Sequence, residues 1–426
     1  MSLALFLPYA KLIAVFTLML LGMRCRLGLG LSVLLGSLCI ALLFGCSVPD
    51  WLRLAGGVFQ DSVILTVWGV VALVLALSAL MESSGQAERF MNALSLRVSS
   101  PAARLVFFPI LIGLLPMPGG AVFSAPMITA VTKNLHVPEV DKSLVNYWFR
   151  HVAELSWPLY PAVILAASFA GISTALLGVW TFPLTLACFG VGWLFLIRPL
   201  SMPAAMTAAA TSEEGRWSNI LRQGAPIFIS LAGALLLEAV FACTSIPMDY
   251  GILFALAAGL LCCLRQNGLG IGDFCRTLVR PHVLKMLFMI GALGVFKNVL
   301  SQGGVAQSII DAGSGDAAIW LLATVLSALM GLLTGMLVAC VGAVAPLLLV
   351  MVESAYGPGH AMPWLTLCMI SGAAGYMASP LHICFVLSCQ YFKVDMATAW
   401  RRMPLPALAY WLCGFVYFLL LWKLTS

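Results

Sequence analysis

The run GLLPMPGGAVFSAPMITA (residues 113–130) and its continuation NYWFRHVAELSWPLYP (residues 146–161) decide the fold. The first run is apolar enough to lie in a bilayer, but its prolines and glycine pair prevent one continuous helix. Broken backbone at membrane depth is tolerated only inside protein or beside a water-filled cavity. The second run places Arg150, His151 and Glu154 in an apolar segment, where ionisable groups mark a pathway or binding site. Together these features are typical of a transporter's substrate site.

The composition places the chain among membrane proteins. Of its 426 residues, 62% are hydrophobic and 9% are charged, whereas a soluble domain carries about 25% charged residues. We therefore expect an all-α polytopic membrane protein with about ten to twelve spanning or re-entrant segments. The net charge is +6, and the basic residues lie in short loops at helix ends. We therefore expect them to determine membrane topology and not to bind nucleic acid. The cysteines form no CxxC pair, and we expect buried thiols, no metal ligands and no cofactor.

A long polar loop, residues 198–224, divides the chain into two halves. Three runs in the second half resemble runs in the first, in the same order and at nearly constant separation, which indicates an internal repeat. The matched runs are 299–309 with 80–90, 331–349 with the stretch from 113, and 378–388 with 156–166. The expected organisation is a first half (1–200, hairpin about 105–130, broken helix about 144–169), a cytoplasmic linker (201–224) and a second half (225–426, hairpin about 317–350, broken helix about 362–391).

The distribution of Lys and Arg predicts that the halves are inverted. If the loop with Arg24 and Arg26 is cytoplasmic and both broken stretches are re-entrant, the segments that fall inside hold most of the basic residues. The opposite segments 171–174, 244–250, 301–316 and 351–361 hold none, and Arg53 alone departs from the pattern. We therefore expect inverted repeats in a multi-pass protein of the inner (cytoplasmic) membrane.

The runs PMPGGAVFSAP, NYWFRHVAELSWPLYP and SPLHICFVLSCQYF resemble a family of uncharacterised prokaryotic integral membrane proteins. That family is grouped with the ion transporter superfamily, alongside the gluconate permeases and, more distantly, the dicarboxylate/sodium symporters. The likeness to gluconate permeases is looser and lies in two broken stretches, 116–126 and 334–346, each followed by a proline-interrupted helix. The resemblance implies a scaffold domain, a transport domain with two re-entrant hairpins, a homodimer and movement of an organic anion. Because the Ser-Asn-Thr hairpin tips of the dicarboxylate branch are absent, substrate and coupling ion are not carried over.

Arg150 cannot deprotonate, so inside a membrane it needs a carboxylate partner or an anionic ligand. It either contacts substrate or pairs with Glu154, which the i,i+4 spacing would put on the same helix face. His151 could relay protons near neutral pH or simply pack. Glu154 is the better candidate for a coupling proton. Lys297, in a later apolar segment, either reaches the membrane surface or pairs, and is a weaker candidate.

Gly119 and Gly120 would let backbone approach a ligand, and the helix start after them would offer N–H groups to an anion. A tight bend without ligand contact is the alternative. In the second hairpin Thr334, Gly335 and Gly342 take the corresponding part, although Gly331 and Gly335 also form a GxxxG packing motif. The predicted substrate-binding residues are Pro118, Gly119, Gly120, Ser124, Arg150, Tyr160, Thr334, Gly335, Ser379 and His382, of which His382 is open between site and structure; His151 and Glu154 are the predicted coupling residues.

The sequence thus favours a secondary active transporter of a small organic anion, a carboxylate or sugar acid, coupled to H⁺ or Na⁺ by alternating access, and not an enzyme. An anion channel could use the same hairpins, and saturable, gradient-coupled uptake would separate the two. An intramembrane metalloenzyme is less favoured because HExxH is absent, although His151, Glu154 and His382 could bind a metal. Metal analysis of purified protein would test that reading.

Overall fold

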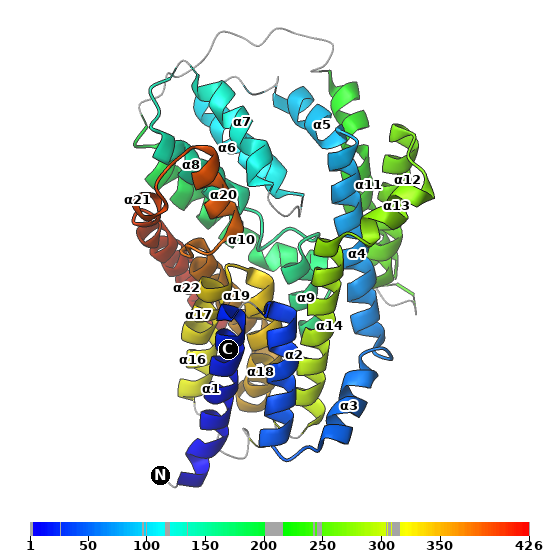
Figure 1. The fold of residues 1–426 in the computed structure, drawn as a ribbon, viewed down its shortest axis with the longest axis vertical. Helices are drawn as coiled ribbons and strands as arrows, with labels where there is room; N and C mark the ends of the chain where they lie inside the picture. Colours follow the sequence, from blue (N-terminus) through cyan, green and yellow to red (C-terminus); the bar gives the residue numbers. More distant parts are fainter. Residues whose placement is uncertain are drawn as a thin grey trace.

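The computed structural model describes residues 3–25, 27–95, 98, 100–115, 120–133, 135–200, 216–241, 243–244, 249–303, 305, 308 and 316–425, which form helices and no strand (Figure 1). In chain order they are α1 (Leu3–Arg24), α2 (Leu29–Leu43), α3 (Val48–Gly57), α4 (Ser62–Ser83), α5 (Gln86–Ser95), α6 (Pro101–Gly113), α7 (Ala121–Thr132), α8 (Glu139–Arg150), α9 (Pro161–Ala170), α10 (Thr174–Gly192), η1 (Trp193–Ile197), α11 (Trp217–Phe241), α12 (Asp249–Asn267), α13 (Ile271–Leu278), α14 (Pro281–Gln302), α16 (Asp316–Leu321), η3 (Leu322–Leu326), α17 (Ser327–Thr334), α18 (Leu337–Tyr356), η4 (Pro358–His360), α19 (Ala361–Met377), α20 (Ile383–Tyr391), α21 (Met396–Trp400) and α22 (Pro404–Thr425). The predicted linker, 201–224, lies largely outside the described residues.

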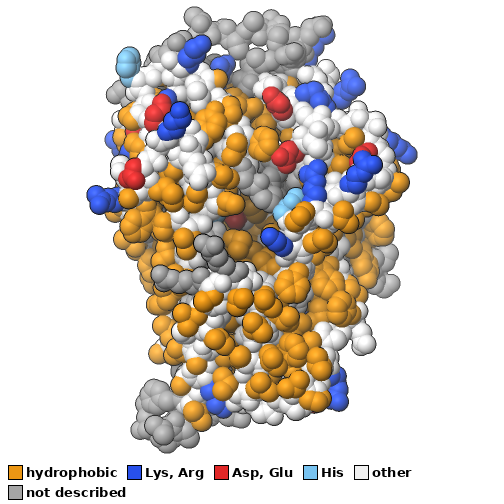
Figure 2. All heavy atoms as spheres, in the orientation of Figure 1, with side chains coloured by type: hydrophobic (Ala, Val, Ile, Leu, Met, Phe, Trp, Pro, Cys, Tyr) orange, Lys and Arg blue, Asp and Glu red, His pale blue; other side chains and the backbone are white. Residues whose placement is uncertain are grey.

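The surface is that of a multi-pass membrane protein. Among the described residues, 8 helical segments are long and apolar enough to cross a bilayer. Large apolar side chains on them point outward, for example Val179 at 71% exposed and Leu236 at 65% exposed. Figure 2 shows hydrophobic side chains over most of one face, with charged side chains gathered mainly at the end that holds α5, α7, α8 and α13. Such a broad apolar surface is stable in lipid and would aggregate in water.

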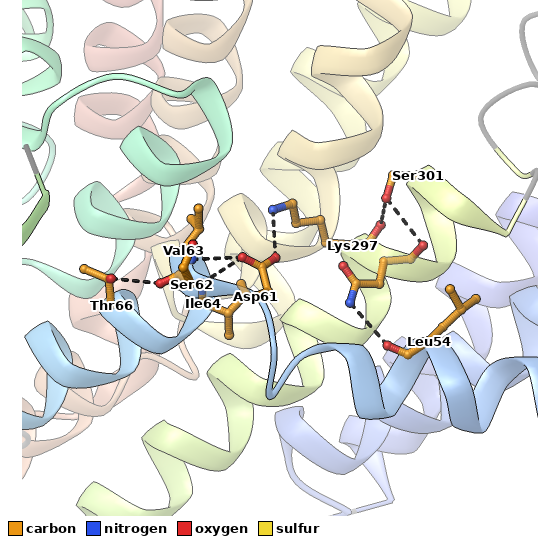
Figure 3. A network of polar contacts seen from close by, with 9 residues as sticks. Leu54, Asp61, Ser62, Val63, Ile64, Thr66, Lys297 and Ser301 are labelled. Carbon is orange, nitrogen blue, oxygen red and sulfur yellow. Dashed lines mark hydrogen bonds and ion pairs between the residues drawn. The ribbon is translucent and has the colours of Figure 1, made fainter. Parts of the chain in front are cut away.

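An ion pair connects helix α14 to the residue that precedes helix α4. The Asp61 carboxylate caps α4 by accepting a hydrogen bond from the Val63 N–H at 2.9 Å, and its other oxygen lies 3.7 Å from Nζ of Lys297 (Figure 3). The same Lys297 ammonium lies 5.8 Å from the centre of the Phe169 ring. Asn298 donates a hydrogen bond to the Leu54 carbonyl of α3. Of the two readings of Lys297, the structure therefore supports the structural pair.

The two hairpins differ in length. In the first, α6 and α7 have 13 and 12 residues, so each is about 20 Å long or less and too short to cross a bilayer. In the second, the arms Asp316–Thr334 and Leu337–Tyr356 are both of membrane-spanning length. Pro346 lies inside α18 and does not end it, so the second break is confined to the residues between Thr334 and Leu337. The inverted, re-entrant relation of the halves stays a prediction.

Both halves contain an interrupted helix, and the two interruptions meet. The first separates α8 from α9 and the second separates α19 from α20. Helix α20 packs against α7 and α8, while α9 packs against α18, so each half contributes to the packing around the other's break. The buried Tyr147 of α8 donates a hydrogen bond to the carbonyl of Tyr376, at the end of α19, at 3.0 Å. The protein core is therefore built from helices of both halves of the chain.

Candidate functional site

A cavity of about 200 Å³ lies where the two interruptions meet. Apolar side chains of α4, α14 and α18 form part of its wall, namely Leu75, Met286, Leu337 and Val338. Its polar and ionisable lining comes from both halves and comprises Arg150, His151, Glu154, Tyr160, His382 and Cys384.

Other hollows are larger but lack this concentration of buried ionisable groups. One of about 750 Å³ lies at the charged end, beside Lys133 and His136. Another of about 640 Å³, between α17, α19 and α22, is lined mainly by apolar side chains. A third, of about 530 Å³, contains a single buried carboxylate, Glu238. The 200 Å³ cavity is thus the candidate site, because a binding site needs a few convergent polar groups in an apolar enclosure.

The last residue of helix α8, Arg150, and the first residue after it, His151, both reach the cavity, where their side chains are buried. We expected helix to continue to Pro158, but α8 ends at Arg150 and residues 151–160 form turns. Pro158 and Pro161 lack the N–H groups that a continuing helix would use, which favours turns before them. The interruption frees the chain to point several side chains inward over a short distance.

The first hairpin makes room for Arg150. A Cβ on Gly120 would lie 2.7 Å from the guanidinium carbon of Arg150, and a Cβ on Gly113 would lie 2.9 Å from its backbone carbonyl carbon. At Gly113 the neighbour is backbone, so only glycine fits there, whereas a side chain at Gly120 would require the guanidinium to move. Sequence reasoning assigned Gly120 to close approach of a ligand, whereas the close approach in the structure is to the arginine. Gly120 thereby helps to set where the positive charge lies.

Glu154 faces the second half. Its Oε2 accepts a hydrogen bond from the Tyr376 hydroxyl at 2.9 Å and lies 4.0 Å from Nε2 of His151. The i,i+4 argument for a pair with Arg150 does not apply, because the helix ends at Arg150 and Glu154 belongs to a turn. The carboxylate is tied instead to a residue 222 positions further along the chain.

Tyr160 and Ser124 hold the first half together around the cavity. Tyr160 precedes α9, lines the cavity and donates a hydrogen bond to the Gly113 carbonyl at the end of α6. The Ser124 hydroxyl donates a hydrogen bond to Oδ1 of Asn146. Nδ2 of Asn146 in turn donates a hydrogen bond to the Ser388 hydroxyl of α20 at 2.9 Å. Ser124 lies within this buried network and not along the cavity wall. Its expected contact with substrate stays a prediction without support from its position.

The second hairpin packs its tip against the second interruption. Gly335 has φ 65°, and a Cβ there would lie 2.9 Å from Cα of His382. Ser379 donates a hydrogen bond to the Leu332 carbonyl of α17 at 2.6 Å, and Thr334 accepts one from the Met336 N–H at 3.2 Å. Gly335 and His382 line the cavity, whereas Thr334 and Ser379 fix the backbone beside it.

Most of the predicted site residues that are described therefore converge. The residues at the cavity wall are Arg150, His151, Glu154, Tyr160, Gly335 and His382. Pro118 and Gly119 lie outside the described residues. Their roles, and those of the converging residues, stay predictions.

Sequence reasoning missed Cys384 and Tyr376. Cys384 was assigned to the buried thiols that act as small hydrophobic groups, but it lines the cavity in the first turn of α20. Its position two residues after His382 gave no clear signal, because residues two apart in a helix face different directions and the orientation depends on where α20 begins. Tyr376 carries no local signal either, since its contact with Glu154 depends on the packing of the halves.

No curated protein matches the chain. Residues 9–420 match the family described as "Protein of unknown function (DUF401)", and the chain therefore belongs to the DUF401 family.

Proposed function

We propose that this protein is a secondary active transporter of a small organic anion, a carboxylate or sugar acid, across the cytoplasmic membrane. The transport cycle would be alternating access coupled to H⁺ or Na⁺, with His151 and Glu154 as the coupling residues. A likeness to gluconate permeases, inverted repeats and a homodimer formed through a scaffold domain belong to the same proposal.

The observation that carries the proposal is the guanidinium of Arg150 at a cavity enclosed by both halves. Arg150 is 4% exposed and lies against Gly120, immediately before α7. A permanent cation at membrane depth is costly, and such residues in membrane proteins mark substrate pathways. The planar fork of arginine matches a carboxylate in two places. The apolar part of the lining would exclude water and strengthen that interaction.

The size of the cavity fits a small solute. Its volume of about 200 Å³ is below the range of about 300–1,000 Å³ that holds drug-sized ligands. Because the wall contains residues from both interruptions, a small relative movement of the halves would change access to the cavity. This arrangement supports a carrier more than a channel, whose conducting pathway must be continuous.

The experiment begins with purified protein and a thermal-shift screen of carboxylates, sugar acids and phosphorylated anions, with and without sodium. Arg150→Lys keeps the charge but loses the fork, so we expect normal insertion and at least about tenfold weaker binding of the selected anion, or about 1.4 kcal/mol. Arg276→Lys is the matched control, because Arg276 has a side chain that is 83% exposed. Calorimetry measures the affinity of the wild-type protein and of both variants for the selected anion. Unchanged affinity in Arg150→Lys would refute the role of Arg150 in anion binding.

Transport itself is measured in proteoliposomes. A carrier gives saturable uptake that is driven by an imposed proton or sodium gradient and shows counterflow of labelled anion. Uptake that grows linearly with anion concentration and shows no counterflow would favour the channel.

A further inference from the structure

Three buried side chains at the cavity form a donor set for a transition metal ion. The ligand atoms of His151, His382 and Cys384 all lie within 4.8 Å of one another. We propose that this trio binds a divalent ion of the zinc class. The proposal goes beyond the transport function and does not depend on which solute is carried.

The orientation of His151 supports the proposal. Its Nδ1 lies 2.7 Å from the carbonyl oxygen of Tyr147. A carbonyl only accepts, so Nδ1 of the neutral ring carries the hydrogen and Nε2 presents a lone pair. Metal-binding histidines are oriented in the same way, by a hydrogen bond from the other ring nitrogen to a carbonyl or carboxylate.

His382 meets His151 across the two halves. The centres of the two rings are 4.6 Å apart and their planes are nearly perpendicular, at 86°. Nδ1 of His382 is buried, and within the described residues it makes no hydrogen bond of normal geometry, although the ring lies near the Gly335 backbone. Buried polar atoms in native proteins are nearly always satisfied, and an unsatisfied one calls for an explanation such as an ion. A metal ion held between the two rings would supply the partner.

Cys384 supplies the sulfur. It is 5% exposed and lines the cavity together with Arg150, and α7 packs against its helix, α20. A nearby guanidinium would stabilise negative charge on sulfur once a metal ion has displaced the thiol proton. Its sulfur therefore differs from a thiol packed only among apolar side chains.

The site contains both positive and negative groups that would act on a bound ion. The positive charge of Arg150 repels a cation, so negative charge from other groups is needed at the site. The thiolate of Cys384 and the carboxylate of Glu154 would together offset the charge of a divalent ion. Glu154 has an oxygen 4.0 Å from Nε2 of His151, so it could supply the fourth ligand or bond a metal-bound water.

The donor atoms also select the type of metal. Two imidazoles and one thiolate suit Zn²⁺ and its neighbours and not Mg²⁺ or Ca²⁺, which prefer oxygen. Bond lengths of about 2.0–2.3 Å place neighbouring ligand atoms of a tetrahedral zinc site about 3.5 Å apart. Side-chain rotations that draw the three atoms together by about 1 Å would complete the site.

Cobalt(II) provides the test, because its absorption spectrum reports thiolate ligation. Full-length protein, purified in detergent without added anion and stripped of metal, is titrated with Co²⁺ and then with Zn²⁺. We expect one ion per chain, a thiolate-to-cobalt absorption band, and displacement of the band by zinc. Because no transported anion is present, this result is independent of the transport proposal.

Cys384→Ser should abolish the band. Cys389→Ser is the matched control, since Cys389 is also buried on α20 but does not line the cavity. Size-exclusion profiles verify that each variant is folded. If Cys384→Ser is not folded, His382→Gln is used as the second variant, and it should weaken cobalt binding. Absence of cobalt binding by the folded wild-type protein, or a band that is unchanged in the folded variant tested, overturns the proposal.

Discussion

Replacing Gly335 with alanine tests whether the second hairpin tip and the second interruption form one packed unit. Gly335 has φ 65°, and an added Cβ would lie 2.9 Å from Cα and 3.1 Å from the backbone nitrogen of His382. The left-handed backbone costs an alanine about 1–2 kcal/mol. Overlap with backbone, which cannot rotate away, adds about 1–3 kcal/mol of overpacking. The combined loss of stability is therefore about 2–5 kcal/mol.

Gly171→Ala is the control that separates the two costs. Gly171 has nearly the same φ, 66°, but a Cβ there would have no atom within 4 Å. The Gly171→Ala variant should therefore lose only the stability that corresponds to the left-handed backbone, about 1–2 kcal/mol. Thermal unfolding of the two purified variants is compared in one detergent at one heating rate, because unfolding of such proteins is often irreversible. If Gly335→Ala unfolds at the same temperature as Gly171→Ala, the tip does not pack on His382 as described.

Three further predictions concern the cavity and the topology. Gly120→Leu should remove anion binding in calorimetry while expression is retained, because the side chain would displace the Arg150 guanidinium; normal affinity would contradict this. Glu154→Gln should retain anion exchange in proteoliposomes but lose gradient-driven accumulation, and unchanged accumulation would remove Glu154 from coupling. Single cysteines at Ser354 and Asp395, both exposed, should be labelled from opposite sides of the membrane in a protein without other accessible cysteines. Labelling of both from one side would exclude the inverted arrangement.

Local sequence was sufficient for the helical membrane class. Membrane segments are recognisable because insertion depends on the summed hydrophobicity of about 20 consecutive residues, which is a local property. The interruptions near Pro158 and Pro380 were also visible, since proline lacks a backbone N–H wherever it occurs. Ionisable residues beside such breaks pointed to Arg150, His151 and His382, because a membrane interior rarely tolerates them without a role.

The tertiary structure decided how those residues are used. The close contact between Gly120 and Arg150, the hydrogen bond from Tyr376 to Glu154 and the approach of Cys384 to the two histidines all join distant parts of the chain. The pairing of Lys297 with Asp61 is of the same kind. Apolar helices carry little information about their neighbours, because lipid and another helix are similarly apolar, and association depends on shape and on a few polar contacts. The sequence therefore determined which residues needed an explanation, and only the packing of the two halves determined their partners.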